Sequence, residues 1–373
     1  MKPYVFSASS LAQLDNCLNE KLLGDHPYTV AYVFFSIVFT PAEIIRAFRN
    51  FKIEVFGAST AGEIANGKVY ENSISVMLLD MDPEAFRINI FKGMEKSSYE
   101  LGREIAAWAK EIFRNPTLTI LSTSMGGWVD GDEIVRGIND VIGSVVPLFG
   151  ALAGNDLVPA HQTYIISSTN FYNKGITAMV IDRDKVETHG IAVCGWKGIG
   201  VTKTVTRSAG NLVYEIDGQP AGDVYNKYLN ISSNADIGYN AFGILLKRDD
   251  KTYVMKAAIS LNDDKSVLYT STIPEGSKIR FCMSPGFEVI DRSLEKLKEF
   301  RHKIAATDAI LAFDCLARRL SLGSLVEQET STLCNLWNAP VAGFFSFGEF
   351  GNNEKGHSDF HSYTLSALLM KKK

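Results

Sequence analysis

The chain has 373 residues, which is longer than one hydrophobic core usually supports, so its length predicts two domains of roughly 150 to 200 residues. Hydrophobic residues make up 46% of the chain and charged residues 21%, as in an ordinary soluble globular protein that buries sizeable cores. The formal net charge of -4 gives no positive field that would attract nucleic acid or an anionic membrane.

The cysteines favour a reducing compartment. They are odd in number, widely spaced and never in a CxxC pair: Cys17, Cys194, Cys282, Cys315 and Cys334. This pattern indicates neither a disulfide framework nor a zinc site. The N-terminal residues contain no uninterrupted apolar segment of a signal peptide, and the longest apolar run, "VAYVFFSIVF", is far shorter than the roughly 20 residues of a membrane helix. We therefore expect a cytoplasmic protein with no membrane or nucleic-acid partner.

Helix and strand patterns are mixed through the first part of the chain. Apolar spacing and start signals predict helices over 10–22, after Pro41, over 99–113 and over "GDEIVRGINDVIG". Buried strands are predicted at 29–38, "IEVFG" and "TLTILSTS". Two hairpins are predicted, one from "SISVMLL" and "AFRINIF" and one within "TAMVIDRDKVETHGIAVCGW", around Arg183 and Asp184.

The pattern starts afresh at about residue 208. "SAGNLVYEIDGQPAGDVYNKYL" predicts a strand, a DG turn and a helix that begins near Pro220. Strands follow at "AFGILLKR", "TYVMKAAISL", "AILAFDC" and "VAGFFSFGEFG", and helices over 286–306 and "LVEQETSTLCNLW". Without a strict strand-helix-strand rhythm, this predicts an α/β (α+β) fold of two modules, 1–215 and 216–373, each of mixed β-sheets covered by helices.

Three apolar strands lead into glycine and small residues that are followed by a carboxylate. The segments are "VFGASTAGEI" with Glu63, "PLFGALAGND" with Asp156 and "PVAGFFSFGEFG" with Glu349. Glycine has no Cβ, so it lets a backbone turn sharply or approach another group closely. Tight turns and close sheet contacts are the structural explanation of each segment taken singly. Because the pattern recurs, we expect the loops after these strands to face the region between the two modules and to form a pocket.

The first segment supplies groups suited to a small zwitterionic ligand. Gly57 and Gly62 remove side-chain bulk, Ser59 and Thr60 supply hydroxyls, and Glu63 can pair with a ligand ammonium. Additional polar groups are expected from elsewhere in the chain: Asp156, Glu349 and His361. The carboxylates could instead cap turns through their own backbone.

A fourth segment, "LSTSMGGWVDGDEI", leads from a strand to the start of a helix. Its two serines, Ser122 and Ser124, precede two glycines and the helix N-terminus, where unpaired backbone N–H groups favour an anion. We predict that this segment holds the carboxylate of the ligand.

Several segments together resemble the FIST family, named for F-box and intracellular signal transduction proteins: "FGASTAGEI", "FGALAGND", "VTRSAGNLVYEIDGQPAGDVYNKYL", "AILAFDCLARRL" and "GFFSFGEFG" followed by "FHSYTLSALL". The resemblance covers nearly the whole chain. It implies a sensory module that recognises small ligands, amino acids or related metabolites. The chain contains no F-box, kinase or methyl-accepting segment, so we expect the signal to pass to a partner protein. The family commonly has Phe-His-Asn near its end, whereas this chain has Ser362 after His361, which removes an amide donor.

Enzymatic motifs are missing, so we expect no catalytic residues and a protein that is not an enzyme. A hydrolase elbow requires GxSxG, but Ser59 is followed by Ala61 in place of the second glycine, and Ser124 is preceded by Ser122. The sequence has no Walker A motif and no GxGxxG that opens a βαβ unit.

The resemblance leaves two alternatives open. Some FIST-like proteins are haem-binding nitric oxide sensors that regulate a histidine kinase or a cyclic-dinucleotide enzyme, with a histidine as the axial ligand. The histidines available are His26, His161, His189, His302, His357 and His361, and none belongs to a CxxCH motif. Eukaryotic members recognise substrates of ubiquitin ligases, which makes a protein-interaction scaffold the second alternative. No metal site is expected.

Overall fold

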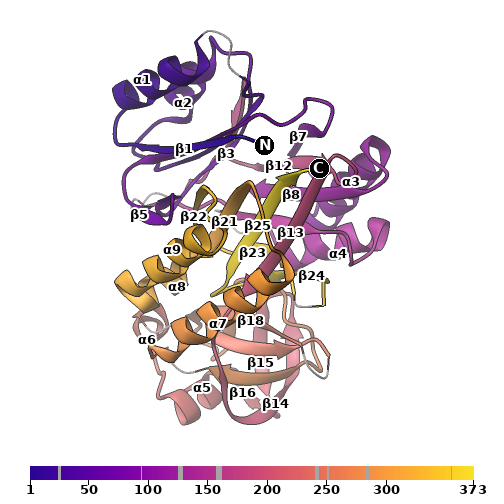
Figure 1. Ribbon diagram of the computed structural model, residues 1–373. Coiled ribbons are helices and arrows are strands. Elements are labelled where there is room, and N and C mark those ends of the chain that lie inside the picture. The colour runs from indigo at the N-terminus through magenta and orange to yellow at the C-terminus, as the bar shows by residue number, and fades with distance from the viewer. Residues whose placement is uncertain are drawn as a thin grey trace.

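The computed structural model describes residues 1–23, 27–93, 95–124, 129–156, 162–239, 243–249, 252–282, 286–353 and 355–373. Within these residues the strands form three six-stranded sheets and one seven-stranded sheet, with helices on the outside (Figure 1). Parallel and antiparallel pairs occur together, so the predicted fold class, mixed sheets covered by helices, is confirmed. No helix in this part of the chain combines the length and apolarity needed to cross a bilayer.

The N-terminal sheet lies at the top of Figure 1. Its strands run in the order β1 (Pro3–Ala8), β6 (Ile74–Leu79), β2 (Val30–Phe35), β3 (Glu54–Ser59), β10 (Ile165–Ser167) and β11 (Phe171–Tyr172). Helices α1 (Leu11–Leu22) and α2 (Pro41–Phe48) pack their apolar sides on it. Both helices begin where predicted, because Ser10 caps the first and Thr40 forms a capping box with Glu43 ahead of Pro41 in the second.

A second sheet, called the α3/α4 sheet here, is covered by α3 (Ser98–Ile112) and α4 (Gly131–Ile142). Its strands are β24 (Ser358–His361), β23 (Glu349–Asn352), β9 (Leu148–Leu152), β8 (Pro116–Ser122), β12 (Gly175–Asp182) and β7 (Phe86–Lys92).

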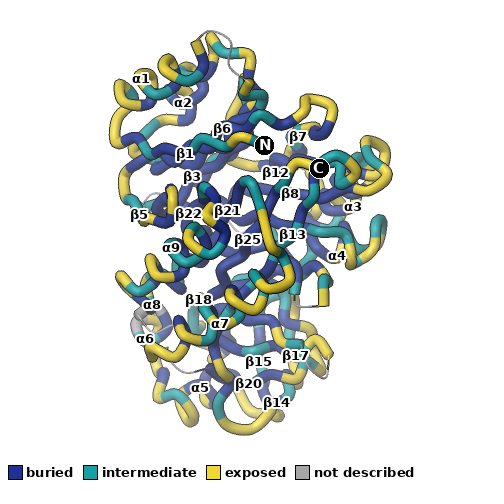
Figure 2. The backbone as a smooth tube through the Cα atoms, in the orientation of Figure 1, coloured by how far each residue is buried: buried dark blue, intermediate teal, exposed yellow. Residues whose placement is uncertain are grey.

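The central sheet lies between the other parts of the molecule. Its strands are β13 (Val186–Val193), β25 (Leu365–Lys372), β21 (Ala309–Cys315), β22 (Val341–Ser346), β4 (Glu63–Ala65) and β5 (Lys68–Tyr70). Its outer side carries α7 (Glu288–Lys303), α8 (Leu316–Leu322), the short 3-10 turn η1 (Gly323–Leu325) and α9 (Val326–Trp337). The inner faces of all three sheets share one core that includes Phe34, Phe149 and Phe344, and Figure 2 shows these strands as buried.

The remaining strands form a barrel at the bottom of Figure 1. They run in the order β14 (Gly198–Ala209), β20 (Lys278–Cys282), β17 (Gly243–Lys247), β18 (Tyr253–Leu261), β19 (Val267–Tyr269), β15 (Leu212–Ile216) and β16 (Gln219–Pro220). Pairing of β14 with β15 closes the ring. Helices α5 (Ala221–Leu229) and α6 (Asn234–Tyr239) accompany it. The DG turn is confirmed, since Ile216 pairs with Gln219 and both Asp217 and Gly218 have positive φ.

Two sheets combine strands from both sides of residue 215. In the central sheet, β4 pairs with β22, and Ala65 lies opposite Ala342. In the α3/α4 sheet, β9 pairs with β23, and Ala151 lies opposite Glu349. The two halves of the sequence therefore do not form separate sheets, and the boundary near residue 215 stays a prediction about the sequence alone.

Both predicted hairpins are wrong. Strand β6 pairs with β1 and β2 in the N-terminal sheet, whereas β7 pairs with β12 in the α3/α4 sheet. Likewise, β12 belongs to the α3/α4 sheet and β13 to the central sheet. The segments between these strands cross from one sheet to the next, and Met81 and Ala85 on the first crossing are buried in the shared core. Apolar runs separated by a short turn do not reveal whether the second strand returns beside the first or enters another sheet.

Candidate ligand-binding site

The three strand-to-glycine segments meet in the structure. The N–H of Ala61 donates to the carbonyl of Phe345 at 2.9 Å, and the N–H of Phe345 donates to Gly62 at 2.8 Å. The N–H of Gly154 donates to Ser59 at 3.0 Å, which ties the second segment to the first. The convergence expected from the sequence is therefore present, and direct backbone hydrogen bonds hold the segments together.

The missing side chains at two of these glycines allow close backbone packing. A Cβ on Gly57 would lie 2.2 Å from the carbonyl oxygen of Val33, and one on Gly150 would lie 1.8 Å from that of Ile120. These two glycines let neighbouring strands approach. Gly62 has a different neighbour, because its Cβ would lie 2.2 Å from Nη1 of Arg319. The missing side chain at Gly62 makes room for this guanidinium.

The polar groups of the first segment are bound within the protein. Ser59 Oγ donates to the carbonyl of Gly154 at 2.8 Å, and Thr60 Oγ1 donates to Glu63. Glu63 also accepts from the N–H and the hydroxyl of Ser73, at 3.1 and 2.6 Å. Burial raises the pKa of Glu63 to about 7, and the charge of Asp156 acts in the same direction. Glu63 is therefore buried, and it lies close enough to Asp156 for the two carboxyl groups to interact electrostatically.

The serines of the fourth segment are also engaged. Ser124 Oγ donates to the carbonyl of Ala153 at 2.7 Å, and Ser122 Oγ donates to that of Thr123 at 3.0 Å. Residues 125–128 lie outside the described part of the chain. The helix itself, α4, is capped by Asp130, which accepts from the N–H groups of Asp132 and Glu133 at 2.9 and 3.3 Å. These N–H groups already hold a carboxylate of the chain, and anion binding by Ser122 and Ser124 stays a prediction.

Glu349 and His361 lie opposite each other on β23 and β24. Both are buried. Ser346 Oγ donates to Glu349 at 2.6 Å, and burial, with Asp314 nearby, raises the pKa of Glu349 well above its usual value. His361 Nε2 lies 3.3 Å from the carbonyl of Gly351, and burial lowers the pKa of the imidazole. Their predicted role as ligand contacts is not tested by these positions.

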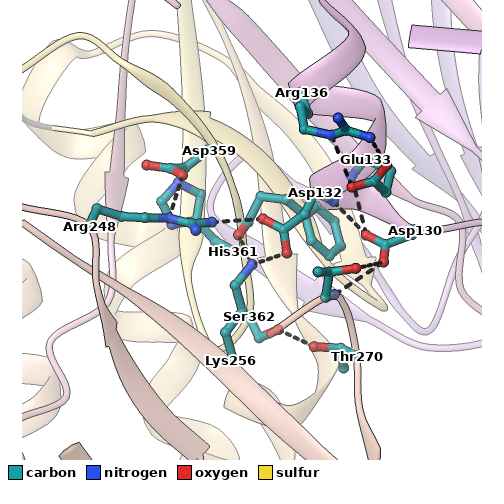
Figure 3. Close-up of polar contacts among 12 residues, drawn as sticks. Asp130, Asp132, Glu133, Arg136, Arg248, Lys256, Thr270, Asp359, His361 and Ser362 are labelled. Atoms are coloured by element: carbon teal, nitrogen blue, oxygen red, sulfur yellow. Dashed lines mark hydrogen bonds and ion pairs between the residues drawn. The ribbon is translucent and has the colours of Figure 1, made fainter. Parts of the chain in front are cut away.

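A charged cluster beside His361 joins the barrel to the α3/α4 sheet (Figure 3). Lys256, on β18 and fully buried, donates to Asp132 at 2.6 Å and to the carbonyl of Phe360 at 2.7 Å. Arg248 bridges Asp132 and Asp359 at 2.8 and 3.1 Å. Each cation of this cluster is paired with a carboxylate. We therefore interpret the cluster as a contact that holds the barrel against the α3/α4 sheet.

An open cleft of about 750 Å³ lies between the glycine segments and α8, η1 and α9. Of the predicted site residues, Gly62 and Asp156 line it, whereas Gly57, Ser59, Thr60, Glu63, Ser122, Ser124, Glu349 and His361 do not. The remaining lining residues are Ala61, Val69, Glu71, Asn72, Asn155, Leu316, Arg319, Leu320, Gly323, Ser324, Val326 and Glu327.

Two lining side chains stand out chemically. Both carboxylate oxygens of Asp156 are buried and have no hydrogen-bond partner among the described residues. Arg319 donates from Nη1 to the carbonyl of Ala61 at 2.9 Å, forms an ion pair with Glu71, and lies 4.9 Å from the ring centroid of Phe345. The cleft thus offers an acceptor for a cationic group and a guanidinium for an anionic one.

Arg319, Glu71 and the helix α8 that carries the arginine were not predicted from the sequence. Two consecutive arginines directly after the buried strand "AILAFDC" were the available signal. The first of them, Arg318, is fully buried and donates to Glu329 at 2.8 Å and to Ser293 Oγ at 2.7 Å. Arg318 and Arg319 therefore face opposite sides: one reaches the core and the other the cleft.

Comparison with known families divides the chain into two parts. Residues 29–219 match the FIST N domain, and residues 221–352 match the FIST C domain. No curated protein matches the chain. Gly62 and Asp156 fall in the first matched region and Arg319 in the second, so both regions contribute to the cleft.

Proposed function

Because the chain belongs to the FIST family, whose domains are associated with small-ligand sensing and signal transduction, we propose that it senses a small zwitterionic metabolite. The ligand is an amino acid or a related compound, and it binds in the cleft lined by Asp156 and Arg319. A partner protein receives the signal, and no residue of the cleft is assigned a catalytic role.

The buried carboxylate of Asp156 is the observation that carries this proposal. A buried acceptor without a hydrogen-bond partner is costly, and a ligand ammonium would supply up to three donors. Glu63 lies close enough for its pKa to respond to the charge of Asp156, so two carboxyl groups gather at this wall. A cationic group of a ligand would relieve the repulsion between them.

The other walls of the cleft suit the rest of such a molecule. Arg319 presents a planar fork of donors that matches a carboxylate. Leu316, Leu320 and Val326 provide apolar surface, and Leu320 is 72% exposed although it is a large hydrophobic side chain. A few convergent polar groups beside apolar surface are typical of small-ligand sites.

The neighbouring arginine supports a route for the signal. On the same helix as Arg319, Arg318 donates to the carbonyl oxygens of Cys194 and Tyr363 and lies 4.8 Å from the ring centroid of Trp196. Cys194 and Trp196 belong to the segment that enters the barrel at β14. A shift of α8 on ligand binding would therefore move the segment that leads into the barrel. We propose the barrel as the part that a partner protein recognises.

A thermal-shift screen against amino acids and related metabolites tests the proposal. A compound present at about 100 times its dissociation constant should stabilise the native state by about 2.7 kcal/mol. Asp156→Asn should weaken its binding by about 10- to 100-fold, because charged hydrogen bonds contribute about 1.5–3 kcal/mol. Asp263→Asn, at an exposed position on the barrel, serves as the matched control and should bind as the wild type does.

The haem alternative is tested by including hemin in the same screen and recording its absorption spectrum. Under the zwitterion proposal, hemin gives no histidine-ligated Soret band and at least one metabolite raises the melting temperature. The reverse result would replace the proposal by a haem-binding nitric oxide sensor that acts on a histidine kinase or a cyclic-dinucleotide enzyme. A chain that responds to neither hemin nor any metabolite would fit the protein-interaction scaffold.

A further inference from the structure

Arg319 already holds a carboxylate in this structure, that of Glu71. We infer that Glu71 is a built-in competitor that covers the anion-binding side of Arg319 and is displaced by the carboxylate of a ligand. The inference rests on the proposed ligand site and concerns how access to that site is regulated. It makes Glu71 a determinant of affinity although this residue does not contact the ligand.

The guanidinium is fixed by buried partners. The carbonyl of Ala61 accepts from Nη1, and the ring of Phe345 lies beside the guanidinium. Ala61 is 2% exposed and Phe345 is fully buried. Gly62, with φ of +119°, leaves the space that Nη1 occupies, which a Cβ would fill. Arg319 is therefore held in place without Glu71.

Glu71 is the exposed member of the pair. Its side chain is 69% exposed, compared with 18% for Arg319. An ion pair whose carboxylate is largely in water contributes little, because solvent screens it and the side chain loses rotamer freedom. Exchange of this carboxylate for another on the same guanidinium therefore has a low cost.

The backbone on both sides of Glu71 is anchored. Tyr70 precedes it and pairs with Glu63 across β4 and β5. Ser73 follows two residues later, and its N–H and hydroxyl hold the carboxylate of Glu63. Rotation of the Glu71 side chain is therefore sufficient for displacement, and the loop keeps its position.

The arrangement favours a zwitterion over a simple carboxylate. Either one can accept from Nη2 of Arg319, the donor that now pairs with Glu71. Only a zwitterion also carries an ammonium for Asp156, which Glu71 cannot supply. A plain carboxylate therefore exchanges with Glu71 on nearly equal terms, which makes acetate the simplest probe of the competition.

Acetate is titrated at constant ionic strength and followed by the backbone N–H resonances of the residues that line the cleft, which remain observable when Arg319 is replaced. We expect acetate to bind Glu71→Gln about two- to five-fold more tightly than the wild type, because the competing charge is gone. Arg319→Met should lose the response, and Arg319→Lys, which keeps the charge without the fork, replaces it if melting curves show that the methionine variant is unfolded.

Glu327→Gln is the matched control, because Glu327 is exposed and lines the same cleft. This change removes one negative charge from the cleft and leaves Glu71 in place. Equal acetate affinities of Glu71→Gln and Glu327→Gln would overturn the inference even if the metabolite screen succeeds. Tighter binding to Glu71→Gln alone, with no metabolite found, would leave the anion subsite standing and reject the zwitterion proposal.

Discussion

Arg318→Met should lower the free energy of unfolding by about 3–5 kcal/mol, because it leaves the carboxylate of Glu329 buried without its cation. Both side chains are fully buried. The carbonyl of Cys194 and the hydroxyl of Ser293 would lose the same donor group. Chemical denaturation with urea, followed by circular dichroism, measures the change.

The adjacent arginine is the matched control for this measurement. Arg319→Met removes the same charge one residue later, but its carboxylate partner Glu71 is largely exposed, so we expect a smaller loss of about 1–2 kcal/mol, most of it from the hydrogen bond to the carbonyl of Ala61. The double variant Arg318→Met/Glu329→Met should recover much of the stability lost in the single variant, because buried ion pairs are often replaced by apolar residues at little cost. Equal losses in Arg318→Met and Arg319→Met would contradict the assignment of Arg318 as a structural cation.

The size of this effect matters for signalling because Arg318 links four parts of the fold. It connects α8 to Glu329 on α9, to Ser293 on α7, to the segment before the barrel and to the segment before β25. Under the proposed route of the signal, a protein weakened at this point should lose the coupling between cleft and barrel before it loses the cleft itself.

Local features of the fold were predictable because their causes lie within a few residues. Ser10 and Thr40 cap helices through N–H groups three residues ahead of them, and the DG turn at Asp217 joins strands that are neighbours in the sequence. The partners of β6 and β12 were not predictable in this way. Their neighbours are chosen by packing between sheets, which a pattern of apolar residues along one segment does not encode.

The residues of the candidate site likewise include some that local sequence predicts and some that it does not. Gly62 and Asp156 were identified because small residues and a carboxylate follow a strand in the sequence. Gly57 has the same pattern but serves close packing against Val33, and only the structure separates these two uses of glycine. The pair of Arg319 and Glu71 was not identified, because 248 positions separate its members.

Glu63→Gln should make the protein more stable than the wild type at pH 8 and leave the two nearly equal at pH 4.5. Burial raises the pKa of Glu63 from 4.5 to about 7, so between these values the folded state binds a proton that the unfolded state does not. The favourable contribution of the protonated group is complete below pH 4.5 and is lost as the pH rises through 7. The difference at pH 8 is of the order of 3 kcal/mol.

Unfolding measured from pH 4.5 to 8 in both proteins isolates this group. Burial also raises the pKa of Asp130, Asp314 and Glu349, but these groups are present in both proteins and cancel in the comparison. Glu327→Gln, at an exposed position, should run parallel to the wild type. Parallel curves for Glu63→Gln and the wild type would show that the buried carboxyl does not titrate in this range.

The same titration should act on the proposed ligand site. Ionised Glu63 adds a negative charge near Asp156, so a cationic group should bind more tightly at pH 8 than at pH 6 in the wild type. In Glu63→Gln this difference should disappear, because the glutamine is neutral at both values. A metabolite from the screen, titrated at the two pH values into both proteins, measures the effect. If the wild type binds it equally at both, the ammonium of the ligand does not lie at Asp156, and the orientation of the zwitterion in the cleft must be reversed or abandoned.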